Sequence, residues 1–128
     1  MSGGGMGRGG DDSARPVEVA VRRSGGAMVL AVRGDLDLDS FEPLCAALNE
    51  AVRQDASLVV VDMSQVTFCD SSTMNVLLRA DADLGPGRLR IAAPSPFVAR
   101  LFGLVGLQMV LPLRDTVEEA LAGSEDLA

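Results

Sequence analysis

An uninterrupted apolar run, Leu58-Val59-Val60-Val61, constrains the fold of this 128-residue chain more than any other segment does. Its three consecutive β-branched residues favour an extended backbone, and the lack of polar alternation suits a strand that is covered on both faces. Such a strand lies in the interior of a sheet, with helices packed against the sheet. The run therefore predicts an α/β protein.

The flanking segments alternate between the patterns of strands and of helices. Apolar residues recur every second position in some segments and every third or fourth position in others. In chain order, we expect strands at 17–22 and 27–32, a helix at 39–52, the strand at 58–61, a helix at 72–83, a strand at 89–93, a helix that begins at 96 and ends at Gly103 or Gly106, a strand at 110–111 and a helix at 115–123. This β-β-α-β-α-β-α-β-α order predicts a mixed, mostly parallel sheet of about five strands with about four helices, beginning with an antiparallel pair.

Residues that favour helix starts precede three of the four helices. A hydroxyl or carboxylate side chain can accept a hydrogen bond from the free amides of the first turn, and a glutamate three residues later completes a capping box. The predicted caps are Asp39 or Ser40, with Glu42 as the box partner; Ser95, followed by Pro96; and Asp115, with Glu118 as the box partner.

The composition divides the chain into one folded domain and two tails. Residues 1–15 are rich in glycine and polar side chains, and such a segment cannot bury enough apolar surface to offset the entropy of ordering. We therefore expect a disordered N-terminal tail at 1–15, a domain at 16–123 and a short C-terminal tail at 124–128.

The charge of the chain argues against several classes of partner. Eleven basic residues, all arginine, face 18 acidic ones, which gives a formal net charge of −7. A chain this acidic is repelled by nucleic-acid phosphates and by anionic lipid surfaces. The sequence contains no histidine, so no histidine can activate a nucleophile or bind a metal. We expect no nucleic acid, no membrane, no metal and no cofactor.

The two cysteines and the apolar segments point to the cytoplasm. Cys45 and Cys69 stand apart in apolar surroundings without metal-ligand spacing, so we interpret them as small, reduced side chains of the interior. No apolar run is long enough to span a bilayer, and the N-terminus has no apolar core of a secretory signal. These features predict a soluble cytoplasmic protein.

The triplet Asp70-Ser71-Ser72 lies between the central strand and the next helix. We expect Ser71 to cap that helix by accepting a hydrogen bond from a backbone amide. Ser72 then occupies the first helical position, where its side chain points outward and a kinase can reach it.

Four stretches of the sequence together resemble the STAS-domain anti-sigma factor antagonists, small bacterial proteins that regulate sigma factors by partner switching. The resemblance covers about Val17 to Leu121. The stretches are Gly34–Asp37 after the second strand, Val59–Ser72 with its Asp-Ser-Ser triplet, Ser95–Leu107, and the last helix at Thr116–Leu121. The triplet is followed by Thr73-Met74-Asn75, where the family usually has Gly-Leu-Gly.

The resemblance implies a phosphorylation switch. It implies that the unphosphorylated chain binds an anti-sigma factor, which then releases its sigma factor. The anti-sigma factor is itself a serine kinase of the histidine-kinase-like ATPase fold, and it phosphorylates Ser72; Thr73 and Ser71 are less favoured acceptors. A metal-dependent serine phosphatase restores the binding form. The expected contact residues for the anti-sigma factor are Asp35, Asp37, Asp70, Ser71, Ser72, Thr73 and Asn75.

Two other classes of function, a binding domain without phosphorylation and an enzyme, are alternatives to this hypothesis. A STAS scaffold that is never phosphorylated, or a domain that senses a small ligand, is the alternative among binding proteins. A serine hydrolase is disfavoured, because the chain has no histidine, no lysine and no Gly-x-Ser-x-Gly elbow. Asp62 and Asp70 could form a carboxylate pair or a metal site, but turn and cap roles suit them better.

Overall fold

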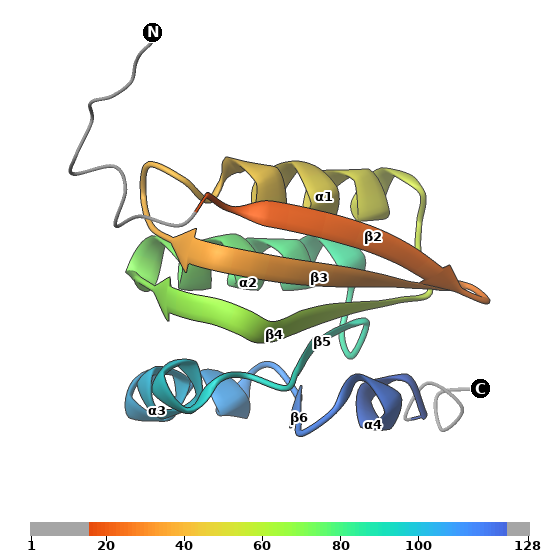
Figure 1. Cartoon of the computed structure of the whole chain (residues 1–128). Coiled ribbons are helices and arrows are strands. Elements are labelled where there is room, and N and C mark those ends of the chain that lie inside the picture. The colour runs from red at the N-terminus through yellow and green to blue at the C-terminus, as the bar shows by residue number, and fades with distance from the viewer. Residues whose placement is uncertain (1–15, 123–128) are drawn as a thin grey trace, which may run out of the picture.

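The computed structural model describes residues 16–122, apart from the side chain of Gln108. Figure 1 shows a sheet with helices packed against it. The predicted tails, at 1–15 and 124–128, and the predicted last helical residue, Gly123, lie outside the described residues. The elements are β2 (Glu18–Ser24), β3 (Ala27–Leu36), α1 (Glu42–Arg53), β4 (Leu58–Cys69), α2 (Ser71–Leu84), β5 (Leu89–Ala92), α3 (Pro96–Val105), the 3₁₀ helix η2 (Leu107–Met109), β6 (Leu113–Arg114) and α4 (Val117–Ala122).

The five strands form one mixed sheet in the order β2-β3-β4-β5-β6. Strands β2 and β3 pair antiparallel across a turn at Gly25 and Gly26, and every other pair is parallel. In the central strand, Val60 lies opposite Val29 of β3 and Arg90 of β5. The predicted fold class and the interior position of the 58–61 run are therefore confirmed.

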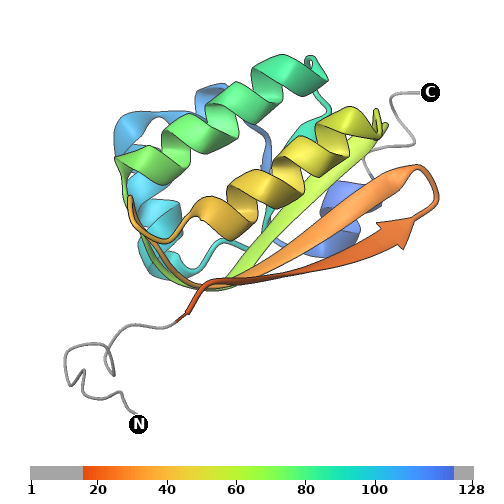
Figure 2. The same cartoon turned by 90° about the horizontal axis from the view of Figure 1, so that it is seen from above.

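Helices cover the two faces of the sheet unequally. Helices α1, α2 and α3 pack on one face over the larger core, in which Leu44, Leu77 and Phe102 are fully buried. Helix α4 packs on the opposite face over a smaller core around Val60 and Ala120. Figure 2 shows α1 and α2 side by side above the strands. The first turns of both helices meet the carboxyl ends of the parallel strands, which is where the site lies.

Strands β3 and β4 are longer than the sequence predicts. The predicted ends were Val32 and Val61, but the strands run on to Leu36 and Cys69. Two register shifts break the side-chain alternation along β3, and Gly34 adopts a φ of 109° within it. A bulged strand does not show the regular period-two pattern from which a strand is predicted.

Two of the predicted helix caps are wrong, and a third is right only in its position. Helix α1 begins at Glu42 after Phe41, with no side-chain cap, and the Ser40 hydroxyl donates instead to the Asp35 carbonyl at 2.8 Å. Ser95 does precede α3, but its hydroxyl donates to the Val66 carbonyl at 2.9 Å. At α4, the amide of Glu119 donates to the Thr116 hydroxyl at 3.0 Å, so Thr116 replaces Asp115 and Glu119 replaces Glu118.

The last strand is also displaced from its predicted place. We expected it at Val110 and Leu111, whereas β6 comprises Leu113 and Arg114. Gly106 ends α3 in a left-handed conformation, with a φ of 75°, and the chain continues into η2. Leu111 is fully buried and Val110 exposed because they leave this turn in different directions, and two adjacent apolar residues alone do not distinguish that turn from a strand.

Candidate functional site

The first turn of α2 is held in place by Asp70. Its backbone is extended, and its carboxylate Oδ1 accepts hydrogen bonds from the amides of Ser72, at 3.0 Å, and Thr73, at 3.3 Å. Asp70 is therefore the N-cap of the helix, and the prediction that Ser71 caps it is wrong. An aspartate caps a helix as well as a serine does, so the triplet alone did not decide between them.

Because Asp70 caps the helix, the hydroxyl groups of the two serines at the start of α2 are not needed as caps. Ser71 is the first helical residue and is exposed, and Ser72 is the second and is half-buried. Within residues 16–122, neither hydroxyl takes part in a hydrogen bond. Ser72 was predicted at the first helical position, and it lies one residue further along.

Thr73 differs from both serines. Its side chain is fully buried, and its hydroxyl donates to the Leu36 carbonyl at 3.2 Å, which ties α2 to the end of β3. This burial and this hydrogen bond disfavour Thr73 both as the alternative phosphoacceptor and as a contact residue.

The end of β3 and the turn that follows it, residues 35–40, which we call the acidic loop, lie against the start of α2. The amide of Leu38 donates to Asp70 Oδ2 at 3.2 Å, so one carboxylate joins the loop to the helix. Within the loop, Asp37 Oδ1 accepts from the Asp39 amide at 3.0 Å and from the Ser40 hydroxyl at 2.8 Å. Asp35 is held by a hydrogen bond from the Thr67 hydroxyl of β4. Asp70 thus joins this acidic segment to the start of α2, where the two serines lie.

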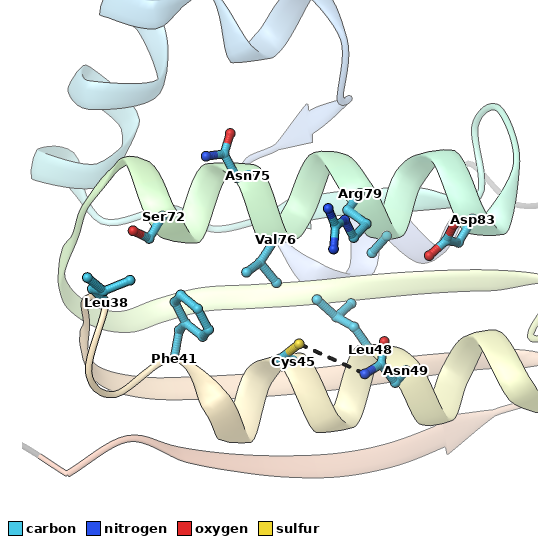
Figure 3. Close-up of a pocket in the computed structure, with 11 residues that line it drawn as sticks. Leu38, Phe41, Cys45, Leu48, Asn49, Ser72, Asn75, Val76, Arg79 and Asp83 are labelled. Atoms are coloured by element: carbon cyan, nitrogen blue, oxygen red, sulfur yellow. Dashed lines mark hydrogen bonds between the residues drawn. The ribbon is translucent and has the colours of Figure 1, made fainter.

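A groove of about 530 Å³ runs between α1 and α2 from this point. Figure 3 shows Ser72 at one end of the groove, near Leu38 and Phe41, and Asp83 at the other end. Asn75, one of the predicted contact residues, is exposed and lines the groove. The contribution of α1 to the groove, through Phe41, Cys45 and Leu48, was not predicted from the sequence.

The two cysteines lie in different surroundings. Cys45 is half-buried in the groove, and the Asn49 amide group approaches its sulfur at 3.9 Å. Cys69 is buried at the end of β4, where burial, reinforced by the nearby charge of Asp70, raises the pKa of its thiol to about 11. The expectation of buried thiols is confirmed for Cys69 and holds only in part for Cys45.

The remaining predicted carboxylate, Asp62, has a local role. Its Oδ1 accepts a hydrogen bond from the Ser64 amide at 3.0 Å. Among residues 16–122, no three histidine, cysteine, aspartate or glutamate side chains gather as metal ligands would. In the same range, no helix has the length and apolar character needed to cross a bilayer.

Fold and site together define a small α/β domain whose candidate site lies at the carboxyl ends of its parallel strands. A family model described as "Mlab, STAS domain" matches residues 19–115. The chain therefore belongs to the STAS domain family, as the sequence predicts.

Three relatives show which members of the family this chain is similar to. The anti-sigma-F factor antagonist RsfB of Mycobacterium tuberculosis is 28% identical over 108 residues, which cover 84% of this chain and 88% of RsfB. The crystal structure of an anti-sigma factor antagonist from Mycobacterium paratuberculosis superposes with a TM-score of 0.80 at 27% identity, over 86% of this chain and 95% of that one. The unphosphorylated form of the antagonist SpoIIAA shares the fold, with a TM-score of 0.70 at 24% identity, over 87% and 99% of the two chains.

Proposed function

We propose that this protein is an anti-sigma factor antagonist whose unphosphorylated form binds an anti-sigma factor and frees the sigma factor. The observation that carries the proposal is the start of α2, where two serine hydroxyls that form no hydrogen bond with any described residue lie beside the acidic loop. The names of the relatives supply the partner class, since both mycobacterial proteins are anti-sigma factor antagonists. The protein then acts by binding rather than by catalysis.

The proposed switch is phosphorylation at this helix start. Ser72 is the acceptor that the sequence predicts. Exposure favours Ser71, because its side chain is open to solvent while Ser72 is half-buried at the end of the groove. The resemblance implies Ser72 as the acceptor, and the cap role expected of Ser71 is filled by Asp70. Single variants of the two serines distinguish the acceptors.

The electrostatics of the site explain how a phosphate would act. A phosphoserine adds a charge of about −1.5 to −2 at pH 7. The helix N-terminus stabilises a negative charge placed there, so the fold tolerates it. Asp35, Asp37 and Asp70 already make the surroundings acidic, so an approaching partner meets a stronger negative field. Repulsion at an interface costs several kcal/mol, and about 2.8 kcal/mol weakens binding a hundredfold.

The proposed cycle has two further participants. The anti-sigma factor serves as the serine kinase and binds ATP in its histidine-kinase-like ATPase fold. A serine phosphatase removes the phosphate. Both reactions belong to the cytoplasm, where we place this protein. No nucleotide site is then required on this chain.

The test begins with a pulldown on the unmodified protein, after which the recovered anti-sigma factor is purified. Titration calorimetry then compares the wild type with Ser71→Asp and Ser72→Asp. We expect the aspartate at the true acceptor to weaken binding about a hundredfold without changing the thermal unfolding midpoint. Incubation with the kinase and ATP, followed by intact mass measurement of Ser71→Ala and Ser72→Ala, identifies the acceptor. Equal affinity of the phosphorylated and bare forms would refute the switch.

The α1–α2 groove supports a second candidate, a STAS domain that senses a small ligand or serves as a scaffold without phosphorylation. Its volume of about 530 Å³ falls within the range of small-molecule sites. On this alternative, kinase and ATP leave the intact mass unchanged, and the binding partner is indifferent to both serines.

A further inference from the structure

The exposed apolar side chains of this protein are concentrated at one corner. Within residues 16–122, eight large apolar side chains are exposed, and six of them belong to the end of β4, to α3 or to the turn that follows α3. We call these six the α3 patch: Phe68, Phe97, Leu104, Val105, Met109 and Val110. Single exposed apolar residues are ordinary, but a contiguous group of them marks an interaction site.

The patch follows from the spacing of α3. Phe97 and Leu104 are seven residues apart, so they lie on one side of the helix, and Val105 is its last residue. Val98 and Phe102, four residues apart, face the core and are fully buried. Helix α3 is therefore apolar on two faces, and only one of them is used by the fold. Leu104 is 79% exposed and Met109 is 83% exposed, so neither contributes to the core.

The patch is continuous with the serine site. The ring of Phe68 stacks on that of Phe97, with centroids 6.0 Å apart, and this contact joins β4 to α3. Phe68 comes two residues before Asp70, and it lies opposite Asp35 in the β3–β4 register. Figure 2 shows the start of α2 and α3 at the same end of the molecule. A partner seated over Ser71 therefore has the α3 patch beside it.

Charge decides among the possible occupants of the patch. The chain has a net charge of −7, and the acidic loop borders the serine site, so an anionic membrane is repelled. Two copies that paired through this corner would bring their two acidic loops together, which disfavours a dimer. A different protein, with basic side chains opposite the loop and apolar side chains opposite α3, complements both surfaces.

We propose that the α3 patch is a second contact area for the anti-sigma factor, adjoining the area around Ser71 and Ser72. The inference rests on the proposed function for the identity of the partner. On this proposal the two surfaces have different roles. The affinity at the serine site depends on the phosphate, whereas the affinity contributed by the α3 patch does not. Removing apolar contacts from the patch therefore weakens both the bare and the phosphorylated complex by the same factor.

The test uses Leu104→Gln combined with Met109→Gln, since both changes keep the size and the charge of the surface nearly constant. The control is Val21→Thr, a similar polar replacement on the exposed face of β2, away from the corner. Each full-length protein is titrated against the purified anti-sigma factor that the unmodified protein recovers. We expect the double variant to bind at least tenfold more weakly, and the control to bind as the wild type does. The thermal unfolding midpoints should agree within about 2 °C, because these side chains lie outside the core.

Four outcomes separate this inference from the proposed function. A weakened double variant together with a weakened serine-to-aspartate variant supports both. Normal binding by the double variant, with the aspartate variant weakened, overturns the α3 patch alone. A weakened double variant with a normal aspartate variant supports the patch and overturns the phosphate switch. Light scattering that shows a dimer of the wild type, lost in the double variant, would give the patch to a second copy and overturn the inference.

Discussion

Removal of the Asp70 carboxylate tests how the site is built. Its oxygens accept three hydrogen bonds, from the amides of Ser72, Thr73 and Leu38. Loss of an N-cap costs about 1 kcal/mol, and loss of the loop hydrogen bond adds up to about 1 kcal/mol. We therefore expect Asp70→Ala to lower the free energy of unfolding by about 2 kcal/mol. For a domain of roughly 100 residues, that change lowers the unfolding midpoint by about 10 °C.

Asp70→Asn is the matched control. Asparagine caps a helix as well as aspartate does, so its Oδ1 can keep the two helix amides. Its amide nitrogen cannot accept from Leu38, so only the loop bond is lost, and the cost falls to about 1 kcal/mol or less. Urea denaturation at pH 7, followed by circular dichroism, measures the order wild type, Asn variant, Ala variant. An Ala variant within about 0.5 kcal/mol of the wild type would refute the account of the site as a carboxylate-tied junction.

Three further predictions follow from buried or constrained positions. Thr73→Val should lower the free energy of unfolding by about 1 kcal/mol, because the hydrogen bond to Leu36 is lost, while phosphate incorporation measured by mass stays as in the wild type. Iodoacetamide should label Cys45 and spare Cys69 in the native protein. The pKa of the Cys69 thiol is about 11 in the folded protein and about 9 in the unfolded one. The free energy of unfolding should therefore fall as the pH rises from 9 to 11, and it should fall less in Cys69→Val. Gly106→Ala should lower the thermal midpoint by several degrees, since a side chain at a φ of 75° costs about 1 kcal/mol, and an unchanged midpoint would contradict the left-handed cap of α3.

Much of the candidate site could be placed from the sequence, because its residues are close along the chain. The helix start at the Asp70-Ser71-Ser72 triplet was predicted to within one residue, although β4 extends to Cys69, eight residues beyond its predicted end. The separate roles within the triplet were not. Which of three adjacent polar side chains turns back onto the helix amides depends on the backbone angles of Asp70, which the extended end of β4 sets.

The hydrogen-bond partners of single hydroxyl groups could not be predicted from the sequence either. Ser40, Ser95 and Thr73 all resemble helix caps or surface residues in the sequence, yet each donates to a carbonyl on a segment that is distant along the chain or on the neighbouring loop. These carbonyls belong to the carboxyl-terminal halves of β3 and β4. Local pattern alone contains no information on which acceptors a sheet leaves open.

The sequence by itself determined the order of the elements, the central position of the Leu58–Val61 strand and the presence of a polar helix start after it. These features could be predicted because they depend on the pattern of apolar and polar residues that are close together along the chain. Tertiary structure decided what the surface presents. It buried Thr73, opened Ser71, set the acidic loop against Asp70 and turned one face of α3 outward. These outcomes depend on which faces of the packed elements remain uncovered, and that is a property of the assembled layers rather than of any one segment.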